Sequence, residues 1–131
     1  MSGLITQVTA GIRVSVHTRY ESRLSSQFAS SHVFSYTITI ENQTEFPVRL
    51  MRRHWFIFDS VGVYNEVEGA GVVGETPVIQ PGQTYQYTSA CDLKSTIGQM
   101  RGYYSMTRIY GNELIRVDIP SFQLAVPDTL N

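Results

Sequence analysis

From residue 34 to residue 40 the chain reads Phe34-Ser35-Tyr36-Thr37-Ile38-Thr39-Ile40. Large apolar side chains alternate with small hydroxyl side chains, which is the pattern of a β-strand with one buried face and one solvent-facing face. The same period of two recurs at 12–16, 85–88, 100–107 and 115–119, and Phe122, Leu124 and Val126 close the chain. No segment has a sustained apolar stripe at helical spacing. We therefore expect an all-β protein whose helix is confined to a short turn.

Turn-forming residues separate these runs, at 42–44, 59–62, 81–82, 96–98 and 111–112. The Ser-rich segment 24–31 reads as a loop. Several short strands at such spacing predict a β-sandwich or a barrel. The 131 residues are enough for one domain with its own core, and there is no linker or internal repeat. We expect residues 1–131 to form a single domain.

One segment breaks the alternation. The apolar residues Val48 and Leu50 stand at even positions, whereas Trp55 and Ile57 stand at odd positions, so a regular strand would point the two pairs to opposite faces. Either a β-bulge near Arg52-Arg53 shifts the register, or both faces of the second half are buried. We place Trp55 in the core. The arginines either protect an edge strand or contact a partner.

Charge and cysteine content limit the classes of function. The chain has 10 basic and 11 acidic side chains, so it lacks the cationic excess of a nucleic-acid groove or a membrane-binding surface. We expect no nucleic-acid partner, and the longest apolar run, 55–58, is far too short for membrane insertion, which needs about 20 residues. The lone Cys91 excludes an intrachain disulfide. With no signal-like start, these features predict a cytoplasmic protein.

A glycine pattern of the form G-x-G-x-x-G occurs at Gly69, Gly71 and Gly74. As a dinucleotide fingerprint it must join a strand to a helix, but Pro77 would fall inside that helix and break it. The neighbouring acidic residues, which would repel a phosphate, are Glu66, Glu68 and Glu75. We interpret the pattern as a loop between strands with at least one glycine at positive φ. The alternative is an anion-binding nest of backbone N–H groups.

Other chemistry finds little support in the sequence. The histidines His17, His32 and His54 are far apart and form no pair with zinc-ligand spacing. Cys91 lies in no nucleophile motif, and a buried thiol is the usual state of a lone cysteine. Glu66 and Glu68 would share a strand face near Asp59, a weak oxygen cluster for a divalent cation. We predict no catalytic residues, no metal ligands and no cofactor.

Several short motifs together resemble the ApaG family, also called CorD. They are Arg53-His54-Trp55, 66–67, 69–75, Pro77, 81–82, 87–89, 100–102, 119–120 and the ending 122–131, and the resemblance runs from about Ile12 to Asn131. It implies a fibronectin-III-like or immunoglobulin-like β-sandwich of two antiparallel sheets. It also implies a bacterial cytoplasmic protein associated with cobalt resistance and magnesium efflux, sometimes encoded beside a diadenosine tetraphosphate hydrolase. Similar domains in eukaryotic proteins look like binding modules, and the resemblance transfers no catalytic residues.

Our leading hypothesis is a non-enzymatic binding module for an unidentified protein partner, with a homodimer left open. The expected interaction surface comprises Arg52, Arg53, His54, Asp59, Glu66, Glu68, Gly69, Gly71, Gly74 and Glu75. The first alternative is a ligand-binding regulator. It would sense a divalent cation through Glu66 and Glu68, or a (di)nucleoside polyphosphate through the loop 69–74. The second alternative is an enzyme of unknown class.

Overall fold

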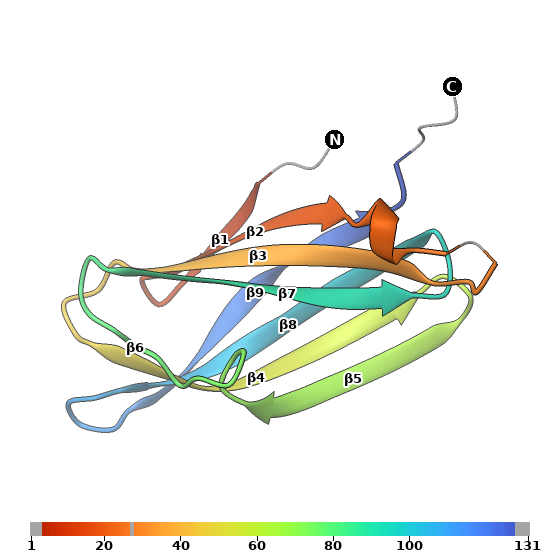
Figure 1. The fold of residues 1–131 in the computed structure, drawn as a ribbon. Helices are drawn as coiled ribbons and strands as arrows, with labels where there is room; N and C mark the ends of the chain where they lie inside the picture. Colours follow the sequence, from red (N-terminus) through yellow and green to blue (C-terminus); the bar gives the residue numbers. More distant parts are fainter. Residues whose placement is uncertain (1–3, 27, 128–131) are drawn as a thin grey trace.

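The computed structural model describes residues 4–26 and 28–127, and β-strands make up nearly all the regular structure there (Figure 1). The strands are β1 (Ile5–Thr9), β2 (Ile12–Tyr20), β3 (His32–Asn42), β4 (Val48–Asp59), β5 (Val63–Ala70), β6 (Val78–Ile79), β7 (Thr84–Leu93), β8 (Ile97–Arg108) and β9 (Leu114–Ala125). Within the described residues the one helical element is the 3-10 turn η1 (Ser22–Leu24). The all-β prediction is confirmed. No helix in this part of the chain has the length and apolar character needed to cross a membrane.

The strands form two antiparallel sheets that pack face to face as a sandwich (Figure 1). The first sheet has the order β1-β2-β3-β7, and the second has the order β5-β4-β8-β9, with the short β6 paired to β4. This arrangement confirms the β-sandwich and agrees with the fibronectin-III-like architecture that the resemblance implies.

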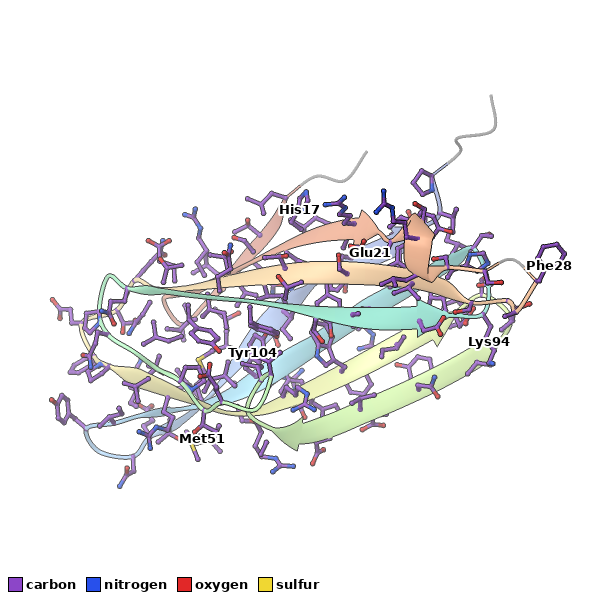
Figure 2. All side chains as sticks on the ribbon, viewed as in Figure 1. His17, Glu21, Phe28, Met51, Lys94 and Tyr104 are labelled. Carbon is purple, nitrogen blue, oxygen red and sulfur yellow. The ribbon has the colours of Figure 1, made fainter. Side chains whose placement is uncertain are left out.

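The inward residues of the alternating runs form the core between the sheets. Phe34, Ile38 and Ile40 are at most 2% exposed. Figure 2 shows Tyr104 in the space between the two sheets, where its hydroxyl lies 2.5 Å from that of Tyr87. This bond satisfies two polar groups that burial would otherwise penalise.

Two β-bulges, one between β4 and β8 and one between β8 and β9, explain where the alternation of buried and exposed residues is interrupted. In β4 the register against β8 shifts between Leu50 and Arg52, so Val48, Leu50 and Trp55 are all buried. The first of the two predicted explanations is therefore confirmed, and the unpaired residue is Met51, next to the predicted Arg52-Arg53. A second irregularity lies between β8 and β9 opposite Met100 and Gly102.

The second bulge merges two predicted runs into one strand. Ile119, Pro120 and Phe122 are all buried in β9, and Pro120 has no N–H to give to a ladder. The alternation had also left out β1, which pairs with β2. Four of the five residues of β1 are exposed, so this strand has no buried face to generate an alternating pattern.

Candidate interaction surface

Strand β4 divides the predicted surface residues between two sides of the sheet, because consecutive side chains of a strand point to opposite faces. Trp55 is 3% exposed and belongs to the core, as predicted. Arg53 shares its parity and faces the same way. Arg52, His54 and Phe56 point outward. The predicted pair Arg52-Arg53 therefore does not form one surface.

The outward residues of β4 meet the two acidic residues of β5. His54 Nε2 lies 2.5 Å from Glu66 Oε2, and His54 Nδ1 lies 3.0 Å from Glu68 Oε2. Arg52 Nη2 donates to Glu68 Oε1 at 3.1 Å. The structure thus brings together Arg52, His54, Glu66 and Glu68, as the sequence analysis expected. Their contacts are with one another, so the two carboxylates are already engaged.

An aromatic and cationic ladder extends this cluster across the sheet. The His54 ring stacks on Phe56 and on Tyr103, with centroids 4.7 and 4.9 Å apart. The Arg101 guanidinium lies 4.7 Å from the centre of the Phe56 ring. The Arg116 guanidinium lies 3.9 Å from the centre of the Tyr103 ring. These are distances at which a cation is attracted to the face of an aromatic ring.

We call the outer surface formed by Arg52, His54, Phe56, Tyr64, Arg101, Tyr103 and Arg116 the aromatic–arginine face. Its residues come from all four long strands of the second sheet. Two hollows flank Tyr103. One of about 240 Å³ lies between Arg101 and Arg116, and one of about 180 Å³ lies beside Arg52 and His54.

Sequence reasoning did not assign the β8 and β9 members of this face. Arg101, Tyr103 and Arg116 occupy the outward positions of runs that the alternation had already identified. The available signal was an outward-facing tyrosine two residues after an outward-facing arginine, Tyr103 after Arg101. What the sequence could not show is that residues of β4, β8 and β9 stack on one another.

Arg53 holds the glycine segment in place. Its Nη1 donates to the carbonyl oxygens of Ala70 and Gly71, both at 3.0 Å. Gly69 permits this approach, because a Cβ there would lie 3.0 Å from the same nitrogen. Arg53 is consequently a structural residue, and we remove it from the predicted interaction surface.

The glycine pattern forms a tight turn that carries a core residue. Gly69 lies inside β5, which corrects the prediction that all three glycines lie in a loop. Gly71 and Gly74 have φ of +62° and +82°, as expected for at least one of them. Val73 and Gly74 both have positive φ, as the centre of a type I′ turn requires. Val72, immediately before, is fully buried between the sheets.

Two further contacts fix this turn. The Gly71 amide donates to the carbonyl of Met51 in the β4 bulge at 2.8 Å. The Tyr85 hydroxyl donates to Glu75 Oε1 at 2.7 Å. Burial first, and then the Glu75 carboxylate, raises the pKa of Tyr85 to about 12. Glu75 thus binds β7 of the first sheet, away from the aromatic–arginine face.

A cavity of about 180 Å³ lies under the turn. Its lining includes Tyr36, Arg53, Tyr87 and Ser89 as well as residues 72–74. This volume is below the roughly 300 Å³ at which small-molecule pockets usually begin. A complete nucleoside polyphosphate would have to extend beyond it.

Asp59 joins two turns at one end of the sandwich. It is 5% exposed and accepts hydrogen bonds from the Lys94 amide at 2.6 Å and from the Ser95 hydroxyl. Burial by itself raises the pKa of Asp59, but the bonds from Ser95 and Lys94 outweigh it and hold the pKa below its ordinary value of 3.8. Asp59 is therefore a structural carboxylate rather than part of an exposed surface.

Replacing Asp59 with asparagine is expected to lower the free energy of unfolding at pH 7 by about 1–3 kcal/mol, because charge-assisted hydrogen bonds are lost. A carboxyl group whose pKa is depressed by folding adds stability above its unfolded pKa. That contribution disappears as the pH falls through the folded pKa. Urea unfolding of both proteins between pH 7 and pH 2 should therefore show the difference shrinking below pH 3.8. A gap that is constant over this range would contradict the role given to the Asp59 charge.

The remaining candidates for chemistry are separate from this face. Burial, and then the charges of Asp92 and Asp59, raises the pKa of the Cys91 thiol to about 11, so it is protonated at neutral pH and a poor nucleophile. His32 is buried at the start of β3, and His17 lies in β2. Among residues 4–26 and 28–127, no group of three or more His, Cys, Asp or Glu side chains is arranged to hold a metal ion.

These observations define a β-sandwich in which one outer sheet face carries interlocked aromatic, arginine and acidic side chains. Comparison with known proteins places it more closely. The model of the ApaG domain matches residues 22–108. The chain belongs to the ApaG family.

Individual relatives agree with this assignment over nearly the whole chain. The protein ApaG of Shewanella halifaxensis is 44% identical, over 97% of this chain and 100% of its own. The protein ApaG of Pseudomonas aeruginosa is 47% identical, over 92% and 94%. The crystal structure of an ApaA protein from Bordetella pertussis is 39% identical and superimposes with a TM-score of 0.84, over 95% and 97% of the two chains.

Proposed function

We propose that this protein is a non-enzymatic binding module that docks onto a protein partner through the aromatic–arginine face. The observation that supports this most is the ladder of Phe56, His54 and Tyr103 with Arg101 and Arg116 stacked on it. Aromatic residues and arginine are enriched among the residues that contribute most to protein–protein binding, since they bury much surface at a low entropic cost.

The other outer face of the sandwich provides an internal comparison. The outward residues of β3 and β7 in the first sheet are mostly small and polar, with Thr37 and Thr88 hydrogen-bonded to each other at 2.8 Å. Both faces are outer surfaces of one fold, so the fold itself does not require large rings on either. The rings of the second sheet are therefore available for another role, and binding is the one their chemistry suits.

We propose a cytoplasmic setting, and that any role in cobalt resistance or magnesium efflux is exerted through the partner. The carboxylates of Glu66 and Glu68 are already bound by His54 and Arg52. A cation at these oxygens would have to displace those contacts. Isothermal titration with Mg²⁺, Co²⁺ and a dinucleoside polyphosphate checks the alternative of a ligand-binding regulator, with binding in any titration favouring that alternative.

Replacing Tyr103 with alanine is expected to weaken partner capture by about thirtyfold, because truncating a central interface residue costs about 2 kcal/mol or more. The measurement is affinity capture from a lysate of the source cells, followed by quantitative mass spectrometry. Light scattering of the purified chain identifies a second copy of the chain as the partner.

The matched control is Tyr110→Ala, since Tyr110 is 72% exposed beyond the end of β8 and outside the aromatic–arginine face. It removes the same side chain and should leave capture unchanged. Circular dichroism must show both variants folded. If the Tyr103 and Tyr110 variants capture the same proteins in equal amounts, the proposed docking face is wrong.

A further inference from the structure

The hollow between Arg101 and Arg116 is a built feature of the sheet rather than an accident of side-chain packing. It holds about 240 Å³ and is lined by Phe56, Tyr103 and Asp118 as well as the two arginines. Gly102 contributes no side chain to it, and the β8–β9 irregularity lies directly beneath, where Ile119 pairs with Gly102. A carbon added at Gly102 would lie 2.1 Å from the His54 carbonyl oxygen, so the close strand packing behind the hollow also depends on this glycine.

The charges around the hollow are unbalanced. Arg116 Nε bonds Asp118 Oδ1 at 3.2 Å. Among the described residues, the Arg101 guanidinium lies within 4 Å of no carboxylate, and its one hydrogen bond runs from Nη2 to the Tyr64 hydroxyl at 2.8 Å. A guanidinium has five N–H donors, so most of the donors of Arg101 are left for a ligand.

Both guanidinium groups are held in position before any ligand arrives. Arg101 is fixed by the Phe56 ring and the Tyr64 hydroxyl, and Arg116 by the Tyr103 ring and Asp118. Stacking occupies the face of a guanidinium and leaves its N–H edge free to bind a carboxylate through two parallel hydrogen bonds. Side chains that are already ordered lose less entropy on binding.

We propose that this hollow receives a carboxylate side chain from an acidic segment of the partner protein. The proposal rests on the function proposed above and adds the chemistry of the partner. The acidic residues of β5 on this face, Glu66 and Glu68, already contact His54 and Arg52. An incoming carboxylate can therefore pair with Arg101 without displacing an existing ion pair of this face.

The probe is a capped tetraglutamate peptide, titrated into the full chain and followed by the Nε–Hε signals of its arginines in NMR spectra. We expect saturable shifts at Arg101 and Arg116 and none with a capped tetraglutamine peptide. Arg101→Gln should weaken binding by about tenfold, as expected for the loss of a charge-assisted hydrogen bond. Arg101→Lys, which keeps the charge and loses the planar fork, should weaken it less.

The matched control is Arg19→Gln on the first sheet, where Arg19 faces solvent beside Glu21. If this variant weakens tetraglutamate binding as much as Arg101→Gln does, the attraction is general and the proposal is wrong. It is also wrong if tetraglutamate produces no shifts, or if a capped phosphoserine peptide binds the hollow while tetraglutamate does not. Backbone NMR spectra of the Arg101 variants check that the fold is kept.

The two proposals fail in different ways. If Tyr103→Ala loses partner capture and tetraglutamate causes no shifts, the proposed docking face is kept. The proposal that the partner inserts an acidic segment is then wrong. A response confined to Arg101 and Arg116, with capture unaffected by Tyr103→Ala, shows that the hollow binds a carboxylate but overturns the docking face and, with it, the partner segment as the occupant.

Discussion

Replacing Gly71 with alanine is expected to lower the free energy of unfolding by roughly 2–5 kcal/mol, combining left-handed backbone strain with a steric clash. Gly71 has φ of +62°, and a Cβ there would lie 2.0 Å from the carbonyl oxygen of Glu75. That oxygen also accepts the hydrogen bond from the Val72 amide at 2.8 Å. It therefore cannot move aside without opening the turn that seats Val72 in the core. Urea unfolding measures the loss as a fall in the midpoint.

Gly74→Ala provides the matched control for this prediction. Gly74 has a similar φ of +82°, but no atom lies within 4 Å of the added carbon. This variant should cost only the strain of the backbone, about 1–2 kcal/mol. If the two variants are equally stable, the clash at Gly71 is relieved in solution and the turn is looser than described.

This comparison also separates the two interpretations of the glycine pattern. In a nucleotide-binding loop, the glycines would matter for ligand affinity in a protein of unchanged stability. Here Gly71 is required by the approach of its own chain, and Arg53 binds the carbonyl oxygens of the segment. We expect the purified Gly71 variant to lose stability when no nucleotide is present.

Replacing Trp55 with alanine is expected to cost about 3–5 kcal/mol, the range for removing a large buried aromatic side chain. Its ring is 3% exposed and lies 5.4 Å from Tyr36 and 5.9 Å from Phe122 between ring centroids. The contact with Tyr36 of β3 joins the two sheets across the core, and the contact with Phe122 of β9 lies within the second sheet. A fall in the melting temperature, recorded by calorimetry, measures the loss.

The neighbouring residue supplies the control, because Phe56 points to the opposite side of β4. Phe56→Ala should cost roughly 1 kcal/mol, since only part of the ring is removed from water. It should instead weaken partner capture, because Arg101 and His54 lose the ring on which they stack. If Trp55→Ala keeps the melting temperature and loses the partner, then Trp55 and not Phe56 faces the interface.

The sequence by itself determined the class of fold and most of its core. Alternation at Phe34, Tyr36 and Ile38 is a local property, because each side chain of a strand points opposite to its neighbour whatever the rest of the chain does. The same logic located Trp55 in the core and required a register break in the segment after Val48. It gave the bulge to within a residue or two, since parity shows that a break exists but not which residue is left unpaired.

Only the tertiary structure decided which outward residues form a surface. Arg101 and Tyr64 are 37 positions apart in the chain. Their strands, β8 and β5, flank β4 in the sheet, and the two side chains form a hydrogen bond across the outer side of β4. Arg52 and Arg53 are adjacent in the chain and end on opposite sides. The sequence records the order of residues along each strand, whereas a binding face is assembled across strands. The pairing of strands and their register, which are long-range properties of the fold, bring Arg101, Tyr103 and Arg116 together on one face.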